Sequence, residues 1–182
     1  MRTSHPASAA PASASGAGLV IALAIACAAL AGADAYAAEP PVLKSGLWEL
    51  SRSGGAQSDT KRVTTMCLDE SVQAQMREFG LGMAKELCSK SDRRFEGNRL
   101  IIDAVCKLGE TTMTTHSVMT FSGNTAYHTD GTATYDPPIM NMTEAKSSID
   151  GKWVGDCKPG QQPGDITLES GQTINIKSMI RK

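Results

Sequence analysis

Residues 88–106 have the sequence CSKSDRRFEGNRLIIDAVC, in which a Gly97-Asn98 dipeptide lies midway between two cysteines. Such a dipeptide between two strands is typical of a tight β-hairpin turn. A turn here brings Cys88 opposite Cys106, or one position away from it. Cross-strand neighbours lie within the Cα–Cα distance of roughly 4.4 to 6.8 Å that a disulfide requires. The stretch therefore predicts an antiparallel hairpin closed by a Cys88–Cys106 disulfide.

The two other cysteines of this region, Cys67 and Cys157, are then left to pair with each other. An even number of cysteines in an exported chain favours disulfides. On the loop-closure model the short link contributes about 3 kcal/mol and the long link about 4 kcal/mol to stability. The spacing contains no Cys-x-x-Cys element, so it favours neither a zinc or iron–sulfur site nor a thioredoxin-like redox site.

Residues 1–37 are predicted to form a cleaved secretory signal peptide. An uncharged apolar run, 18–30, precedes the small-residue pattern Ala35-Tyr36-Ala37, so we expect cleavage between Ala37 and Ala38. The run is shorter than the about 20 apolar residues of a membrane-spanning helix. We therefore predict a periplasmic protein with no membrane span after cleavage.

Two alternatives remain for the amino terminus: an uncleaved anchor and a lipoprotein attached through Cys27. Cys27 lacks a lipobox leucine at position 24, and the apolar run continues beyond it. The expected mature chain is a single domain, 38–182, with a core at 44–157 and a carboxyl-terminal extension at 158–182. Its lysines and arginines nearly balance its acids (18 against 19 in the whole chain), and only 4% of residues are aromatic. This composition is not typical of a nucleic-acid-binding protein.

One helix is predicted after the second strand. It begins near Asp69 or Ser71, either of which can cap it, and Gly80 and Gly82 weaken its centre by about 1 kcal/mol each. Its apolar residues recur at helical spacing, on one face: Val72, Met76, Phe79, Met83 and Leu87. We interpret this stripe as core packing against a sheet, with a binding face as the alternative.

The rest of the chain alternates in the pattern of β-strands. Turns are predicted at Ser122-Gly123-Asn124, Asp130-Gly131 and Asp150-Gly151, and a turn or loop at Asp136-Pro137-Pro138. The segments expected as strands are 46–51, 62–67, 111–121, 125–129, 140–149, 152–155 and 173–177, and 158–164 is expected to be a loop. The fold class is therefore mainly β: an antiparallel meander of about eight strands that forms a curved sheet or open barrel.

Two histidines follow the hairpin, and a three-residue turn would place both on the same sheet face, with His128 opposite Val118. Histidine and methionine are ligands suited to copper, which makes a periplasmic copper site one alternative. Its candidate ligands are Met113, His116, Met119, His128, Met140 and Met142. Methionine at alternate strand positions is more often core, so no metal or other cofactor is predicted.

No catalytic motif is present: the chain lacks Gly-x-Ser-x-Gly, His-Glu-x-x-His and the glycine-rich phosphate loops. An enzyme with an unrecognised site around His116, His128 and Asp130 is the alternative to a non-catalytic protein. The mixed charges around the hairpin tip are interpreted as a solvated sheet edge. They are Lys90, Asp92, Arg93, Arg94, Glu96 and Arg99.

The chain resembles a family of exported bacterial proteins catalogued as domain of unknown function 3617. The resemblance rests on Lys44-Ser45-Gly46-Leu47-Trp48-Glu49, on Cys67-Leu68, on single cysteines at 88 and 106, and on Gly151-Lys152-Trp153-Val154-Gly155-Asp156-Cys157. The first loop lacks the methionines and prolines of many members. The resemblance implies export and a four-cysteine pattern but no activity.

These observations predict a non-catalytic periplasmic β domain that binds a partner. The partner is either a small apolar molecule inside the curved sheet or a cell-envelope protein along an exposed edge.

Overall fold

The computed structural model describes residues 40–54 and 61–180. The predicted signal peptide, the cleavage site at Ala37 and Ala38, and Cys27 lie outside the described residues. No helix of the described part is long and apolar enough to cross a membrane.

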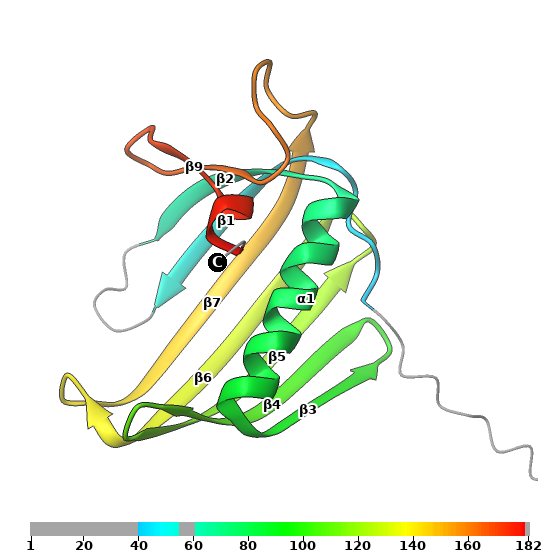
Figure 1. Ribbon diagram of the computed structural model, residues 1–182. Coiled ribbons are helices and arrows are strands. Elements are labelled where there is room, and N and C mark those ends of the chain that lie inside the picture. Colours follow the sequence, from blue (N-terminus) through cyan, green and yellow to red (C-terminus); the bar gives the residue numbers. More distant parts are fainter. Residues whose placement is uncertain (1–39, 55–60, 181–182) are drawn as a thin grey trace, which may run out of the picture. The chain divides into compact units, whose positions relative to one another are not determined.

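Nine antiparallel strands form one open sheet in the order β3-β4-β5-β6-β7-β1-β2-β8-β9 (Figure 1). The mainly β prediction, with one helix after the second strand, is confirmed. The elements are β1 (Gly46–Gly54), β2 (Arg62–Leu68), α1 (Glu70–Leu87), β3 (Cys88–Glu96), β4 (Arg99–Leu108), β5 (Thr111–Ser122), β6 (Ala126–Ile139), β7 (Met142–Gly155), β8 (Asp165–Thr167), β9 (Thr173–Asn175) and α2 (Ile176–Ile180).

Two predicted turns are wrong, because β6 runs through Asp130-Gly131 and β7 runs through Asp150-Gly151 without a break. The segments expected as separate strands at 140–149 and 152–155 therefore belong to one strand. One strand that the sequence did not predict, β8, follows the predicted loop. It has only three residues, which are too few to show an alternating pattern.

The Asp136-Pro137-Pro138 segment lies within the end of β6 and is not the turn that the sequence predicted. Its ladder to β7 is interrupted between Thr134 and Ile139, so the prolines stand where no backbone donor is needed. The turn follows at Met140 and Asn141, which both have positive φ angles (49° and 65°). Met140 therefore belongs to this turn and not to a strand.

The turn between β5 and β6 is also displaced. It spans residues 123–125, so His128 pairs with Thr120 instead of Val118. The shift is an even number of positions, so His116 and His128 share one face, as expected for a three-residue turn and not for a two-residue turn.

The four cysteines pair as the sequence predicts, Cys88 with Cys106 and Cys67 with Cys157. The β3–β4 hairpin turns at Gly97 and Asn98, and a bulge between Cys88 and Lys90 brings the two cysteines directly opposite each other. The short bridge thus lies where α1 ends and β3 begins.

Helix α1 crosses one face of the sheet, here called the inner face, from the end of β2 to the start of β3 (Figure 1). The Asp69 carboxylate caps it by accepting a hydrogen bond from the Val72 amide (2.8 Å), and the helix continues through both glycines. Val72 and Trp48 have no exposed surface and form a core with Met66 and Leu68.

The carboxyl-terminal extension completes this end of the domain. The Gly164 amide donates to the Cys67 carbonyl (2.8 Å), and β8 then adds to β2. The strand predicted over 173–177 ends at Asn175, because α2 begins at Ile176. Ile176 packs against the Trp48 core, so the extension is part of the fold.

Candidate ligand cavity

A cavity of about 330 Å³ lies between α1 and the inner face of the sheet. Fourteen of its eighteen lining residues are apolar, and its floor comes from β1, β2, β4, β5 and β6. The floor residues are Trp48, Leu50, Met66, Leu68, Leu100, Ile102, Met119, Phe121 and Tyr127. A cavity with this lining is suited to an apolar molecule, although its volume is at the small end of the roughly 300 to 1,000 Å³ of ligand sites.

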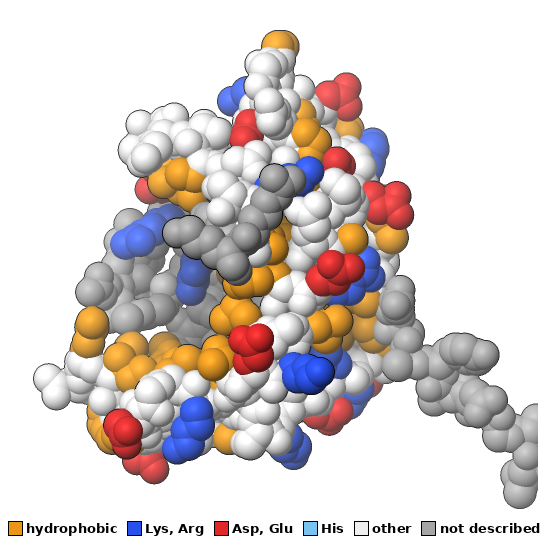
Figure 2. Space-filling view, viewed as in Figure 1, with side chains coloured by type: hydrophobic (Ala, Val, Ile, Leu, Met, Phe, Trp, Pro, Cys, Tyr) orange, Lys and Arg blue, Asp and Glu red, His pale blue; other side chains and the backbone are white. Residues whose placement is uncertain are grey.

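The roof of the cavity comes from the first half of α1, where Glu70, Gln73, Met76 and Arg77 line it. The apolar stripe of α1 is not sealed against the sheet. Only Val72 of this stripe is buried, whereas the exposed fractions are 37% for Met76, 45% for Phe79 and 43% for Met83. The core-packing interpretation of the stripe is therefore wrong beyond the first turn of the helix. Figure 2 shows hydrophobic side chains open to the surface in a hollow beside α1.

The segment 40–43 closes one end of the cavity and is fastened to α1. The Gln73 side chain makes two hydrogen bonds to the Leu43 backbone: Oε1 accepts from the amide (2.8 Å) and Nε2 donates to the carbonyl (2.9 Å). The Lys44 amide donates to the Asn124 carbonyl (2.9 Å), which ties the same segment to the β5–β6 turn. This end wall is thus held by the roof and by the sheet.

Two stacked rings form the deepest part of the floor. The centroids of Trp48 and Tyr127 lie 5.8 Å apart, and burial raises the pKa of the Tyr127 phenol. The Tyr127 ring lies over Gly151, where a Cβ atom would come within 2.3 Å of it. The Thr129 hydroxyl, one inner-face position further along β6, is buried without a hydrogen-bond partner in the described residues.

The tryptophan motifs at the two ends of the core contact each other near this end of the cavity. The Trp48 indole donates to the Lys44 carbonyl (2.8 Å), and the Trp153 indole donates to the Ser45 carbonyl (3.0 Å). The Lys44 ammonium lies 3.5 Å from the centre of the Trp153 ring. Gly46 leaves room for β7, because a Cβ atom there would lie 2.3 Å from the Gly155 carbonyl oxygen.

A second hollow of about 510 Å³ continues from the cavity along the inner face, with Ile102 lining both. Its floor is made of small residues, among them Ser117, Gly131, Ala133 and Ala145. The inner face therefore forms a trough that is apolar beneath α1 and more polar beyond it. A wider hollow of about 700 Å³ elsewhere on the sheet is lined mainly by hydroxyl and charged side chains, which suits no apolar ligand.

Both histidines lie on the opposite face, here called the outer face, and each contacts aspartate. His128 Nδ1 lies 2.6 Å from Asp150 Oδ1, and Nε2 lies 3.1 Å from Asp130 Oδ2. The hydrogen bond with Asp150, aided by that with Asp130, raises the pKa of His128. With both nitrogens engaged by carboxylates, neither is placed to take a proton from a nucleophile.

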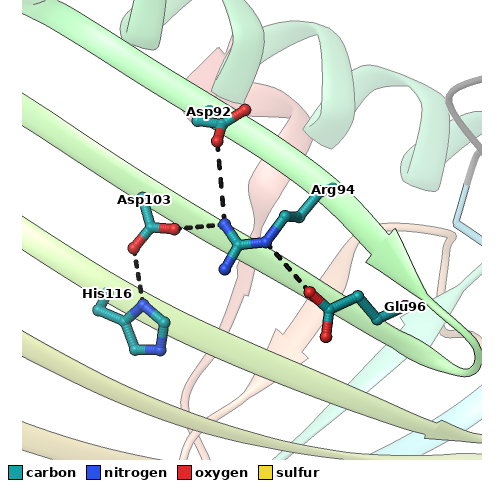
Figure 3. Close-up of polar contacts among 5 residues, drawn as sticks. All are labelled: Asp92, Arg94, Glu96, Asp103 and His116. Atoms are coloured by element: carbon teal, nitrogen blue, oxygen red, sulfur yellow. Dashed lines mark hydrogen bonds and ion pairs between the residues drawn. The ribbon is translucent and has the colours of Figure 1, made fainter.

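His116 belongs to a separate outer-face network that crosses β3, β4 and β5 (Figure 3). Its Nδ1 atom lies 2.7 Å from Asp103 Oδ1, and the Arg94 guanidinium donates to Asp103 Oδ2 (2.6 Å). The hydrogen bonds from His116 and Arg94 lower the pKa of Asp103. On this face, Arg94 and His116 therefore pair with carboxylates of the β3–β4 hairpin.

The structure does not bring the copper candidates together. Met113 and Met119 take the inner-face positions of β5, whereas His116, three positions from each, takes the outer face. Met140 is 89% exposed at the β6–β7 turn, and Met142 follows it. Within the described residues no three His, Cys, Asp or Glu side chains form a group that could hold a metal ion.

Sequence reasoning missed the cavity because it assigned the α1 stripe to the core. In the observed register Arg93 shares a face with Leu100 and Ile102, not with Asp92 and Arg94. The sequence left this register open by one position, and the other choice would pair Arg93 with Ile101. Arg93 is exposed on the edge strand β3, in agreement with the solvated-edge interpretation, but it also lines the cavity.

A family model described as "Protein of unknown function (DUF3617)" matches residues 43–157. No curated protein and no solved structure matches the chain. The matched region contains both disulfides and all of the cavity floor but ends before β8, β9 and α2.

Proposed function

The chain belongs to the DUF3617 family of proteins of unknown function, as its motifs predicted, and we propose that it is a non-catalytic periplasmic protein that binds a small aliphatic molecule in the inner cavity. The observation that carries the proposal is the apolar floor beneath α1, where Met76 lines the cavity and remains exposed. Apolar surface in contact with water costs about 25 cal/mol per Å². A ligand between the helix and the sheet would cover this apolar surface and remove the cost. Without a ligand the surface remains in contact with water.

An aliphatic chain suits the lining better than a planar ring system. The roof and floor contribute flexible thioethers from Met66, Met76 and Met119, which adapt to chains of varying shape. Two of the three aromatic rings of the floor, Trp48 and Tyr127, stack on each other, which leaves less ring surface for a ligand. A single chain also fits a cavity of 330 Å³ that opens at one side.

The cavity is a better candidate than the sheet edge for the binding role. The exposed edge strand β3 has Lys90, Asp92 and Glu96 along it, and charges of both signs discourage the addition of a further strand. The periplasmic location is part of the proposal. It is supported by two disulfides, which persist in oxidising compartments, and by the apolar leader sequence.

Displacement of the fluorescent probe N-phenyl-1-naphthylamine by octanol, decanol and dodecanol tests the proposal. Each added methylene should contribute up to about 0.8 kcal/mol, or about fourfold in affinity, until the cavity is full. The Met119→Trp substitution fills the floor from β5 and should weaken dodecanol binding at least tenfold.

Thr114→Trp is the matched control, because it places the same side chain on the outer face of the same strand. It should leave dodecanol binding unchanged, and circular dichroism should show that both variants fold. Equal weakening by the two substitutions, or an affinity that is independent of chain length, would show that the alcohols bind elsewhere and would refute the cavity as the site.

A further inference from the structure

We propose that the ligand is an anionic single-chain amphiphile, which places its carboxylate or phosphate head group at Arg93 and its chain in the inner cavity. The inference rests on the proposed function, because it names the chemical class that the same cavity takes up.

Arg93 faces the apolar side of the sheet, unlike the charged residues next to it. It pairs with Ile102 in the β3–β4 register, and both residues line the cavity. Asp92 and Arg94 point to the outer face, where they contact each other at 3.8 Å (Figure 3). Of three consecutive charged residues, only the middle one is directed to the ligand site.

Arg93 and Arg94 also differ in their ion pairs. Arg94 has carboxylate oxygens of Asp103 at 2.6 Å, Glu96 at 3.3 Å and Asp92 at 3.8 Å. No ion pair joins Arg93 to an acid within residues 40–54 and 61–180. A guanidinium group binds carboxylate and phosphate oxygens through paired hydrogen bonds, so Arg93 has the capacity to hold a head group.

Arg77 adds a second positive charge to the cavity from the side of the helix. The only acid among the lining residues is Glu70, seven residues earlier on α1 and therefore about 10 Å away along the helix axis. Glu70 lies toward the end that the 40–43 segment closes, next to Gln73, which holds that segment. The described lining therefore contains two arginines and one acid.

The exposure of the lining residues orients the amphiphile. Arg93 is exposed, whereas Leu100 and Phe121 on the floor are only 5% exposed. A head group at Arg93 keeps its contact with water, and the chain that follows it enters the dry part of the cavity. A neutral chain gains the same apolar contacts but lacks the charge-assisted hydrogen bond.

The experiment compares dodecanoate, dodecyl phosphate and dodecanol as competitors of N-phenyl-1-naphthylamine at low ionic strength and about pH 8, where carboxylates are ionised. The native protein should bind both anions about tenfold more tightly than dodecanol. Arg93→Gln should reduce this preference below about threefold without changing the affinity for dodecanol, and Arg93→Lys should retain part of it.

Arg99→Gln is the matched control, because it removes the same charge from the outer face of β4. It should preserve the preference for anions. A native protein without this preference, or an Arg93→Gln variant that keeps it, would overturn the inference while dodecanol binding upholds the proposed function. If neither anion nor alcohol displaces the probe, the proposed function itself is wrong.

Discussion

At the scale of single residues, the two Asp-Gly dipeptides show why turn chemistry failed to predict this sheet. Asp130 and Asp150 point to the outer face and hold the two nitrogens of His128. The glycine that follows each of them faces inward, where Gly151 lies under the Tyr127 ring and Gly131 lines the second hollow. In each dipeptide the aspartate therefore contacts His128 on the outer face, while the glycine leaves space on the inner face. Turn propensity alone does not reveal that the strand continues through the dipeptide.

Gly151→Ala should destabilise the domain and widen the cavity floor, because its Cβ atom would meet the Tyr127 ring at 2.3 Å. We expect a loss of about 1 to 3 kcal/mol, which is typical of overpacking, and a shift of Tyr127 away from Trp48. Urea unfolding measures the loss, and near-ultraviolet circular dichroism reports the ring pair. The Gly97→Ala variant, at a turn glycine with open space around it, separates ring displacement from backbone strain. An unchanged aromatic signal in Gly151→Ala would contradict the account.

The contacts of His128 also predict how stability depends on pH. Its folded-state pKa is raised above the unfolded value of about 6.5, chiefly by the hydrogen bond with Asp150. Its contribution is therefore fully present below about pH 6.5 and is lost as pH rises through the folded-state pKa. Urea midpoints measured between about pH 5.5 and 8.5 should show this fall in the native protein and in His116→Asn, but not in His128→Asn. A histidine resonance of His128 that titrates below the unfolded value would refute it.

At the scale of elements, the hairpin and the helix were predictable because their signals are local. The Gly97-Asn98 turn brings Cys88 to within one position of Cys106, and Asp69 caps the helix that follows β2. What the sequence did not reveal is how far α1 stands from the sheet. A helical apolar stripe has the same spacing whether it contacts a packed core or roofs a cavity. Only the strands beneath the helix, which are distant in sequence, distinguish a packed core from a cavity. In this fold Phe79 remains nearly half exposed.

The candidate site could be predicted only in kind. An apolar molecule inside a curved sheet followed from export, strand alternation and missing catalytic motifs, but no lining residue was assigned to it. The lining combines inward positions of six strands with one helix face and the segment 40–43, so an error of a single residue in register would remove a strand's contribution. The displaced β5–β6 turn removed no strand from the lining. It shifts the pairing by two residues, which leaves each side chain on the face expected for a three-residue turn. The contacts of the histidines could not be predicted for a related reason: Asp150, which contacts His128, belongs to a strand whose continuity the Asp-Gly dipeptide concealed.

At the scale of the whole domain, the two disulfides constrain very different lengths of chain. Cys67–Cys157 spans 90 residues and encloses α1 and β3 to β7, whereas Cys88–Cys106 spans 18. On the loop-closure model, the Cys67→Ala/Cys157→Ala pair should cost about 4 to 5 kcal/mol and the Cys88→Ala/Cys106→Ala pair about 3 kcal/mol, as measured by urea unfolding. Each double variant is the control for the other, since both remove one bridge and two sulfur atoms. A larger loss from the short bridge would mean that its role at the α1–β3 junction, and not chain entropy, dominates. In that case the same variant should also weaken dodecanol binding, because the junction holds the roof of the cavity over its floor.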